Sequence, residues 1–439
     1  MLEAEIEDKP PDKALEKKVL WSNVIGLTIS WLIWNPVQNA TYTYWQVFLL
    51  GLGATPIIIS LISAISTIIL SISRIPGGYL TDKVGRVRLI TTMTFVITGT
   101  YLMMAFAPSW EWILIANIIS SIALFYQPAL QAIIADSLPP EKRSRGYAVV
   151  NILPTVVTVI SPYIALIFVS RYGIIEGTRW LLILSFIAGV IAGIVRLLTL
   201  KETIDNHNQK VFEHSMLGDM KKEYVKAIKI IWQRMKYLLI GYLLAGVAEG
   251  LTFLFQLYTL EYLMISTEMW AYLTIVSQIL FIGMAYPFSI LADKIGRKKP
   301  ITFAIICEFI ASVLIAIAPI GPSAELYVIA FAVLGSMGNA AATTSIPAME
   351  ADLIPQEIRG KAYAVNELLF STIMATFQLV GGYLYSAFSP RLPFIISVLL
   401  WLLVIILLLK VPETLEKKTE STSENSEDTD AGETQELTQ

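Results

Sequence analysis

The stretch GYLTDKVGRVR, at residues 78–88, joins one long apolar segment to the next through a short basic connection. The stretch SILADKIGRKK, at residues 289–299, joins two apolar segments in the same way in the second half of the chain. The two stretches share the pattern of an acidic residue, a lysine, a glycine and an arginine at identical spacing. A pattern that occurs once in each half of the chain, with the same internal spacing, indicates an internal duplication.

Two further pairs of matching segments flank these connections in the same order. The stretch DSLPPEKRSRGYAV at 136–149 matches DLIPQEIRGKAYAV at 352–365, and the dipeptide at 202–203 matches the dipeptide at 413–414. Three matched sites in one order predict two copies of a six-span unit. Because six is an even number, the copies share their orientation and form a parallel repeat about an axis along the membrane normal.

The composition places most of the chain in a lipid bilayer. Hydrophobic residues make up 55% of the 439 residues, and Asp, Glu, Lys and Arg only 15%, against roughly a quarter in ordinary soluble domains. The charges concentrate in residues 1–18, 201–236 and 410–439. A soluble enzyme could not cover its surface with so few charges, and no broad basic surface is present for nucleic acid. We therefore expect a lipid bilayer, and no nucleic acid, among the partners.

Apolar runs of roughly 20 residues are long enough to cross a bilayer as helices. The sequence predicts an all-α integral membrane protein with twelve transmembrane helices in two parallel-repeat six-helix bundles. The expected spans are 21–44, 56–81, 88–107, 111–136, 146–170, 179–200, 237–261, 268–292, 300–318, 325–350, 362–388 and 392–411.

Lysine and arginine set the predicted orientation. They gather in the connections after spans 2, 4, 8 and 10 and are rare in the connections on the other side. The basic side is expected to be cytoplasmic, so both termini are placed in the cytoplasm. The predicted organisation is a cytoplasmic N-terminal tail, a first six-helix bundle, a cytoplasmic amphipathic linker, a second six-helix bundle and a disordered acidic tail, at 1–19, 20–200, 201–236, 237–411 and 412–439.

The loop motifs and the six-plus-six pattern resemble the major facilitator superfamily. The string G-x-x-x-D-K-x-G-R-x-R at 78–88 is similar to that family's motif between its second and third helices. The resemblance covers residues 20–415 and implies a transporter fold, while it does not name a substrate. The second copy departs from the pattern because Ser289 stands where the first copy has Gly78.

The loop residues are candidates for contacts that close the cytoplasmic side. Gly78 would permit close helix approach, and the Asp82 carboxylate would accept backbone N–H groups at the start of a helix, which the resemblance implies is span 11. Arg86 could pair with Asp136 and help to lock the halves. The alternative is that these loops only orient the chain by their positive charge. The full candidate set is Gly78, Asp82, Gly85, Arg86, Asp136, Arg143, Asp293, Gly296, Arg297, Asp352 and Arg359.

Polar side chains recur at helical spacing along one stripe of spans 1, 4, 7 and 10. Such side chains are costly in lipid unless they face a cavity or a partner, and the resemblance implies that these four spans line a central cavity. The alternative is that they hydrogen-bond between packed helices. Trp31, Trp34, Tyr44 and Trp45 could also stack on a solute, although aromatic side chains are common at membrane interfaces as well. The candidate cavity residues are Asn35, Gln38, Asn39, Gln127, Gln131, Glu249, Thr252, Gln256, Asn339 and Thr343.

Glu249 is the candidate for proton coupling. It lies near the middle of span 7, where desolvation of a carboxylate favours its protonated form. A neutral, hydrogen-bonded glutamic acid in a helix contact is the alternative. Glu308 in span 9 is also deep in the membrane and is interpreted as a structural acid.

The leading hypothesis is a secondary transporter that moves a small organic solute by alternating access, coupled to protons as symport or antiport. The alternatives are a facilitative uniporter, a drug or metabolite efflux antiporter and, last, a non-transporting membrane sensor. No phosphate-binding G-x-x-x-x-G-K-[ST] loop occurs, which argues against an ATP-driven pump. We expect no enzymatic activity, no cofactor, no metal, a monomer, and a location in the plasma membrane.

Overall fold

The computed structural model describes residues 13–138, 143–203 and 215–414, and it describes side chains in these ranges except at 13–20, 74–83, 143–148, 215–227 and 357. Every regular element in these ranges is a helix. The chain divides into two compact units. Unit 1 takes its residues from Met1–Thr43 and Ile69–Lys210, and unit 2 from Tyr44–Ile68 and Val211–Gln439.

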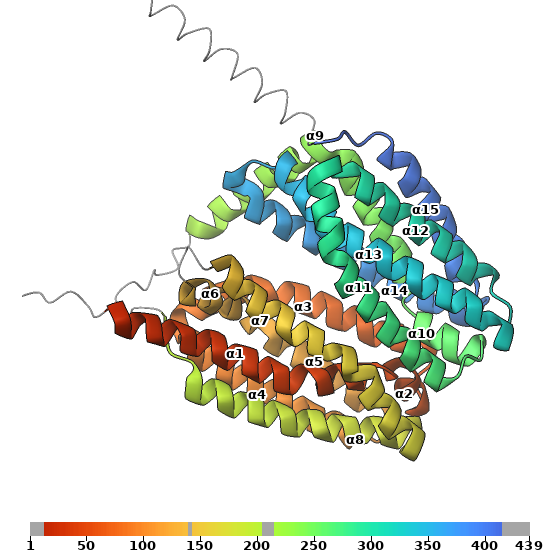
Figure 1. Ribbon diagram of the computed structural model, residues 1–439, viewed down its shortest axis with the longest axis horizontal. Coiled ribbons are helices and arrows are strands. Elements are labelled where there is room, and N and C mark those ends of the chain that lie inside the picture. The colour runs from red at the N-terminus through yellow and green to blue at the C-terminus, as the bar shows by residue number, and fades with distance from the viewer. Residues whose placement is uncertain (1–12, 139–142, 204–214, 415–439) are drawn as a thin grey trace, which may run out of the picture. The chain divides into compact units, whose positions relative to one another are not determined.

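Three long helices form the framework of unit 1. Helix α1 (Lys13–Tyr42) packs along α8 (Ser161–Thr199), and α8 packs along α4 (Arg86–Ala105) (Figure 1). Non-helical backbone at Gly173 (φ 77°, ψ 170°) divides α8 into two helical parts. The remaining elements are the later part of α3 (Pro56–Val84), α5 (Trp110–Ala123), η1 (Leu124–Tyr126), α6 (Gln127–Ser137), α7 (Arg143–Val157) and η3 (Thr158–Ile160).

Small residues bring α8 and α4 together. A Cβ atom at Gly189 would collide with the Thr98 side chain, and one at Gly193 would lie 2.7 Å from the Phe95 ring. Close approach of this kind is how membrane helices gain packing energy when lipid is as apolar as their side chains. The contact aligns the next turn of α8, which carries Arg196, with the interior of unit 1.

Unit 2 is built around α9 (Ser215–Leu251), which packs against α14 (Arg359–Ala387) and α15 (Leu392–Leu408). Helix α13 (Glu325–Leu353) packs against α11 (Thr267–Ile295) and α12 (Lys298–Ile317). After Leu251 the chain bends by 43° into the following short helices. The shorter elements are α2 (Trp45–Gly51), α10 (Phe255–Leu257), the π-helical turn η4 (Tyr258–Tyr262), η5 (Pro322–Ala324) and η6 (Gln356–Ile358).

Residues 44–68 belong to unit 2 because of specific hydrogen bonds. The Tyr44 hydroxyl donates to the carbonyl oxygen of Thr267 at 2.8 Å. The backbone N–H of Gln46 donates to the side-chain oxygen of Gln256 at 2.7 Å, and the side-chain oxygen of Gln46 accepts from the backbone N–H of Leu257 at 3.1 Å. The compact units therefore differ from the predicted boundaries 20–200 and 237–411, which stay a prediction.

Within the described residues, eight helical segments are long and apolar enough to cross a membrane, or nine if the bent pair Ile228–Leu251 and Phe255–Tyr262 is one span. Each of the predicted spans falls on helical residues, but the number twelve stays a prediction. Helix α1 does not reach this threshold, α15 is a shorter apolar helix, and α8 carries two predicted spans in one segment.

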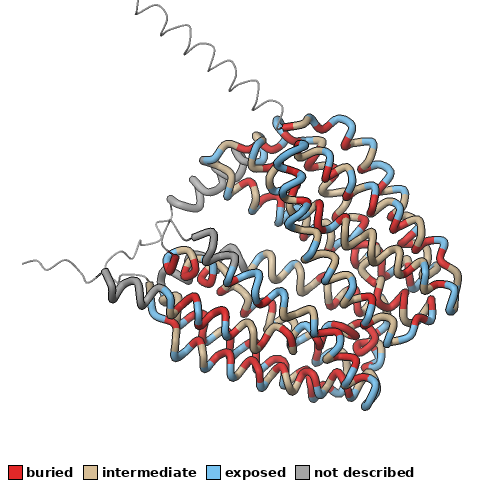
Figure 2. The backbone as a smooth tube through the Cα atoms, in the orientation of Figure 1, coloured by how far each residue is buried: buried red, intermediate tan, exposed pale blue. Residues whose placement is uncertain are grey.

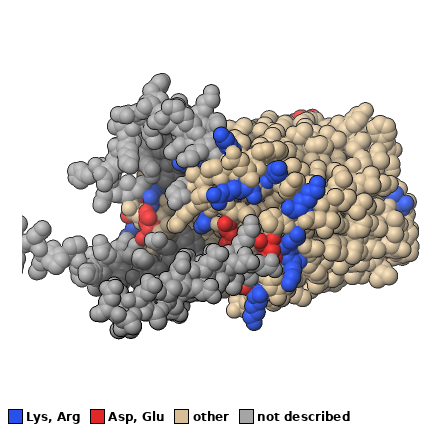
Figure 3. Space-filling model, turned by 90° about the horizontal axis from the view of Figure 1, so that it is seen from above, with Lys and Arg blue, Asp and Glu red and all other residues tan. Residues whose placement is uncertain are grey.

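The outer surface of these helices is apolar. Large hydrophobic side chains stand exposed along them, among them Leu198, Leu326 and Leu409, each more than two-thirds exposed, and Figure 2 shows exposed residues recurring along the helices. Figure 3 shows a wide area of the visible face without Lys, Arg, Asp or Glu. Surfaces of this kind are stable in lipid and would aggregate in water.

The predicted linker 201–236 has a helical second part. Helix α9 begins at Ser215 and changes direction at Met235, whose backbone is non-helical (φ −138°, ψ 27°). The first part of the linker, 204–214, and both predicted tails beyond residues 13 and 414 lie outside the described residues. The position of this helix at a membrane surface stays a prediction.

Candidate functional site

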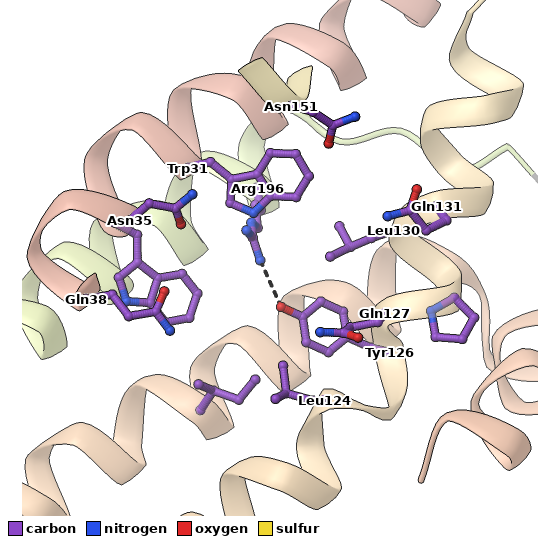
Figure 4. Close-up of a pocket in the computed structure, with 13 residues that line it drawn as sticks. Trp31, Asn35, Gln38, Leu124, Tyr126, Gln127, Leu130, Gln131, Asn151 and Arg196 are labelled. Atoms are coloured by element: carbon purple, nitrogen blue, oxygen red, sulfur yellow. Dashed lines mark hydrogen bonds between the residues drawn. The ribbon is translucent and has the colours of Figure 1, made fainter. Parts of the chain in front are cut away.

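Unit 1 contains a cavity of about 620 Å³ between its helices. Its wall combines aromatic rings, amide side chains and one arginine, a composition suited to a small organic solute. The residues come from α1, α4, η1, α6, α7 and α8 (Figure 4) and are Trp31, Trp34, Asn35, Gln38, Ile97, Leu124, Tyr126, Gln127, Pro128, Leu130, Gln131, Asn151 and Arg196.

Four of the predicted cavity residues line this cavity. Asn35 and Gln38 reach it from α1, and Gln127 and Gln131 reach it from α6. The predicted Asn39 is exposed, donates to the Asn35 carbonyl oxygen at 2.8 Å, and does not line the cavity. Helical spacing and the cavity therefore share Asn35 and Gln38 on α1, and the role of these residues in binding a solute stays a prediction.

Local structure explains how the polar side chains are held. Gln38 donates from its amide to the Tyr101 hydroxyl at 2.7 Å, which fixes its side chain against α4. The short η1 segment separates α5 from α6, and Pro128 occupies the first turn of α6, where a missing N–H is tolerated. This break turns Tyr126 and Gln127 toward the same cavity.

Arg196 is the charged cavity residue that the sequence analysis missed, and Tyr126 and Asn151 are polar lining residues that it also missed. The Arg196 side chain extends from α8 toward the residues of η1 and α6 (Figure 4) and is completely buried. The guanidinium donates to Ser30 Oγ at 3.0 Å, Thr94 Oγ1 at 2.7 Å and Tyr126 Oη at 3.4 Å. Arg196 lies one turn before the end of an apolar span, where an arginine commonly extends to the membrane surface. The signal in the sequence is the helical spacing of Arg196 from Gly189 and Gly193, which places the three residues on one face of the helix.

The five predicted cavity residues of unit 2 are not among the described residues that line the cavity of unit 1. Glu249, Asn339 and Thr343 are exposed and Thr252 is half-buried. Gln256 is buried and serves a structural contact, since its side-chain oxygen accepts the Gln46 backbone N–H. The interpretation of polar stripes as helix-packing contacts therefore describes Gln256, while the other four stay candidates.

The structure brings Glu308 close to Glu249. The two carboxylates, on α12 and α9, are near enough to repel each other electrostatically. A third acid, Glu350 of α13, is buried and accepts a hydrogen bond from the Asn366 amide at 2.9 Å. The packing of Ile305 and Phe309 of α12 against the cluster that holds Ala248 of α9 places the first two acids near each other. The sequence analysis did not anticipate this proximity.

The motif loop of unit 1 forms a compact charged cluster. Arg86 pairs with Asp136, as predicted, and donates to Thr203 Oγ1 at 2.8 Å. Glu202 accepts from the Val87 backbone N–H at 3.1 Å, at the start of α4. Gly85 has φ 93°, in the left-handed region that favours glycine. Because Arg86 and Asp136 both belong to unit 1, this pair fastens helices within one unit.

Unit 2 builds the same cluster from the matching residues. Arg297 pairs with Asp293 and lies with Nε 3.7 Å from Asp352 Oδ2. Glu413 accepts from the backbone N–H groups of Arg297 at 2.8 Å and Lys298 at 3.0 Å. Thr414 and Gly296 correspond to Thr203 and Gly85 of unit 1. The Thr414 hydroxyl donates to Asp352 at 3.1 Å, and Gly296 has φ 97°.

Of the other predicted loop residues, the structure describes the side chain of Arg359 but not those at positions 78, 82 and 143. Arg359 donates to the Ala351 carbonyl oxygen at 2.7 Å and so ties two ends of one loop together. The side chains of Gly78, Asp82 and Arg143 lie outside the described residues, so their predicted contacts stay predictions. The sequence analysis noted Glu202 and Glu413 as matching residues but missed that they cap α4 and α12.

Comparisons with known proteins agree with this architecture. A family model described as the Major Facilitator Superfamily matches residues 22–335 and 238–436. An uncharacterized MFS-type transporter of Methanocaldococcus jannaschii is 23% identical over 361 residues, 79% of this chain and 83% of that protein. The multi-drug resistance efflux pump PmrA of Streptococcus pneumoniae is 23% identical over 295 residues, 67% of this chain and 70% of that protein.

Solved structures share the fold at low sequence identity. The nucleoside transporter NupG gives a TM-score of 0.65 at 14% identity, covering 89% of this chain and 98% of that one. The human organic anion transporter MFSD10 gives a TM-score of 0.58 at 16% identity, covering 91% of this chain and 100% of that one. These likenesses concern the fold alone.

Proposed function

This chain belongs to the major facilitator superfamily, and from this premise we propose that it is a secondary transporter that moves a small organic solute by alternating access. The observation that carries the proposal is the cavity of about 620 Å³ in unit 1. Its amide and aromatic side chains come from apolar helices, where polar groups are costly unless a solute or water meets them. A sensor without transport activity would need no such cavity.

We propose that transport is coupled to protons through Glu249. Glu249 is supported in this role by its place on an apolar helix and by the neighbouring carboxylate of Glu308. A carboxyl group can accept and release a proton, and Glu308 supplies a second group of this kind beside Glu249. A proton gained or lost by this pair would change the charge of α9 and α12 and so favour one conformation over another.

The loop clusters are proposed to stabilise one conformation from within each unit. Each cluster joins the start of one helix to the ends of two others by charge-assisted hydrogen bonds. Such bonds are stronger than neutral ones and hold each unit rigid while it moves. We also propose a monomer in the plasma membrane with both termini in the cytoplasm, in keeping with the basic connections.

Transport in proteoliposomes tests the proposal. The purified chain is reconstituted and given three labelled probes, uridine, 1-naphthoate and ethidium, with an imposed pH gradient and again after the gradient is dissipated by a protonophore. Accumulation of a probe above its equilibrium level only with the gradient supports proton coupling. Equilibration without accumulation supports the facilitative uniporter, and no uptake of any probe contradicts transport of these three classes.

An efflux antiporter is the second candidate. It is favoured by the similarity to the efflux pump PmrA over 67% of this chain. It differs from a symporter in the direction of the proton gradient that drives solute movement. Reversing the imposed gradient in the same vesicles separates the two, because a symporter accumulates solute on the side that protons enter and an antiporter on the opposite side.

A further inference from the structure

Arg196 is a buried cation without a matching anion. Its side chain has 0% relative exposure in the core of unit 1. Within the described part of the chain, no carboxylate forms an ion pair with it. Burying a charge is costly unless a counter-charge or several hydrogen bonds compensate, so the surroundings of this guanidinium need explanation.

The protein compensates the charge only with neutral groups. Ser30 from α1, Thr94 from α4 and Tyr126 from η1 each accept a hydrogen bond. The rings of Trp34 and Trp31 lie 5.7 Å and 6.0 Å from the guanidinium carbon, within the range of cation–π attraction. These contacts orient Arg196 but leave its full positive charge in place.

Two donors remain without a partner beside the cavity. Among the described residues, neither Arg196 Nη2 nor Trp34 Nε1 has a hydrogen-bond acceptor, although both atoms are buried. Both side chains line the cavity. A buried donor that makes no hydrogen bond costs free energy. This cost favours an acceptor that arrives with a bound molecule.

None of the described residues that line the cavity carries a negative charge. The thirteen residues that line it include one arginine and no aspartate or glutamate. The amide side chains of Asn35, Gln127 and Gln131 line the cavity, and the rings of Trp31, Trp34 and Tyr126 supply flat apolar surface. A purely structural cross-link between α8, α1 and α4 would not require a cation with a donor left open.

We propose that this cavity binds an organic monoanion, with its carboxylate on Arg196 and its planar apolar body against the tryptophans. The guanidinium presents donors in a fixed fork that suits a carboxylate, and the aromatic wall suits a ring system. The proposal names the solute class of the proposed transporter and rests on that function for its role in transport. Binding itself does not depend on it.

Ligand binding to the full chain in detergent tests the proposal. The probes are 1-naphthoate, 1-naphthamide and 1-naphthylmethylamine, which carry one ring system with a negative, a neutral and a positive group, together with hexanoate as an aliphatic anion. Equilibrium dialysis measures affinity, and thermal unfolding measures stabilisation, which a ligand of the folded state must produce. We expect 1-naphthoate to bind most tightly and hexanoate more weakly. Equal binding of the three naphthyl probes, or no binding of either anion, overturns the proposal.

Variants assign the binding to Arg196. Arg196→Gln is expected to weaken 1-naphthoate binding about 10- to 100-fold, the range for a lost charge-assisted hydrogen bond, and to leave 1-naphthamide binding nearly unchanged. Arg196→Lys keeps the charge without the fork and is expected to weaken binding about 3- to 10-fold. Arg171→Gln is the matched control, because Arg171 is an exposed arginine of the same helix and should bind as the wild type does.

The outcomes remain interpretable if a variant fails to fold. The preference of the wild-type chain for the anionic probe is measured without any substitution, and Arg196→Lys offers a milder change at the same site. Anion-selective binding without transport would contradict the proposed function and leave the anion site standing. Transport of uridine or ethidium with equal binding of the three naphthyl probes would support the proposed function and contradict the anion site.

Discussion

The two units share a scaffold at their motif loops and differ in the charge of their membrane helices. Unit 1 joins Arg86, Asp136 and Glu202, and unit 2 joins Arg297, Asp352 and Glu413, by contacts of the same kind. Away from these loops, unit 1 buries the cation Arg196, whereas helices α9, α12 and α13 of unit 2 carry Glu249, Glu308 and Glu350.

This contrast between the loop clusters and the helix interiors indicates which parts of a duplicated chain must keep the same contacts in both copies and which can change. The loop clusters satisfy helix starts and ends, a requirement that each copy of the unit must meet. The helix interiors meet no such common requirement, so one copy can hold an anion site and the other a proton site. Substitutions in one unit at a time test whether the anion site and the proton site lie in different units.

The largest expected effect comes from Glu249. Glu249→Gln should lower proton-driven accumulation of 1-naphthoate in proteoliposomes by at least about 10-fold, because the amide cannot carry a proton. Binding of 1-naphthoate in detergent should stay at the wild-type level, because the anion site lies in unit 1. Glu261→Gln, an exposed acid of the same unit, is the control. Full gradient-driven accumulation by Glu249→Gln would contradict a role of Glu249 in proton coupling.

The next effect concerns the glycines at helix contacts in each unit. Gly250→Ala should destabilise the protein by about 1–3 kcal/mol, because the added Cβ would lie 2.6 Å from the Met374 backbone oxygen, which cannot rotate away. Gly189→Ala should cost less, since its Cβ would meet the Thr98 side chain. Thermal unfolding in detergent measures both, with Gly99→Ala as the control at a site with open space. Equal losses at Gly250 and Gly99 would contradict the close contact.

The helix caps should differ between the two loop clusters. Glu413→Gln is expected to cost about 1–2 kcal/mol, because Glu413 accepts three backbone N–H groups, from Arg297, Lys298 and Thr414. Glu202→Gln should cost less, since Glu202 is exposed and accepts two. Thermal unfolding of the two variants gives the comparison, and a larger loss for Glu202→Gln than for Glu413→Gln would contradict the expected order.

The smallest expected effect is at the amide edge of the cavity. Gln131→Leu should weaken 1-naphthoate binding about 2- to 5-fold, because one neutral hydrogen bond contributes little net free energy. Asn39→Leu is the control, since Asn39 is exposed outside the cavity. Equilibrium dialysis of both variants is sufficient. An effect of Asn39→Leu equal to that of Gln131→Leu would show that the cavity edge is drawn in the wrong place.

Helical spacing predicted part of the site because it depends on the chain alone. Asn35, Gln38, Gln127 and Gln131 lie on polar stripes of their helices, and the structure places them at one cavity. The same spacing also selected Gln256, which is buried against Gln46 instead. Periodicity identifies a polar face, but it does not say whether that face meets a solute or a neighbouring segment.

Arg196 and the Glu249–Glu308 pair required the fold. Arg196 is separated in sequence from Ser30 by 166 residues and from Thr94 by 102, and nothing local indicates that these hydroxyls converge on it. Glu308 is interpreted from the sequence as a structural acid, and no feature of the linear chain places it near Glu249. Both features arise where distant helices pack, at contacts whose partners no spacing rule specifies.

From the sequence alone follow the helical membrane fold, the matched loops and the pairing of Arg86 with Asp136, because apolar length, charge placement and internal repetition are properties of the linear chain. The tertiary structure alone decided that α1, α4 and η1 surround a lone arginine and that two carboxylates of unit 2 are neighbours. The physical reason is that burial and electrostatic environment depend on which helices pack together, and small residues such as Gly189 set that packing through contacts far apart in the sequence.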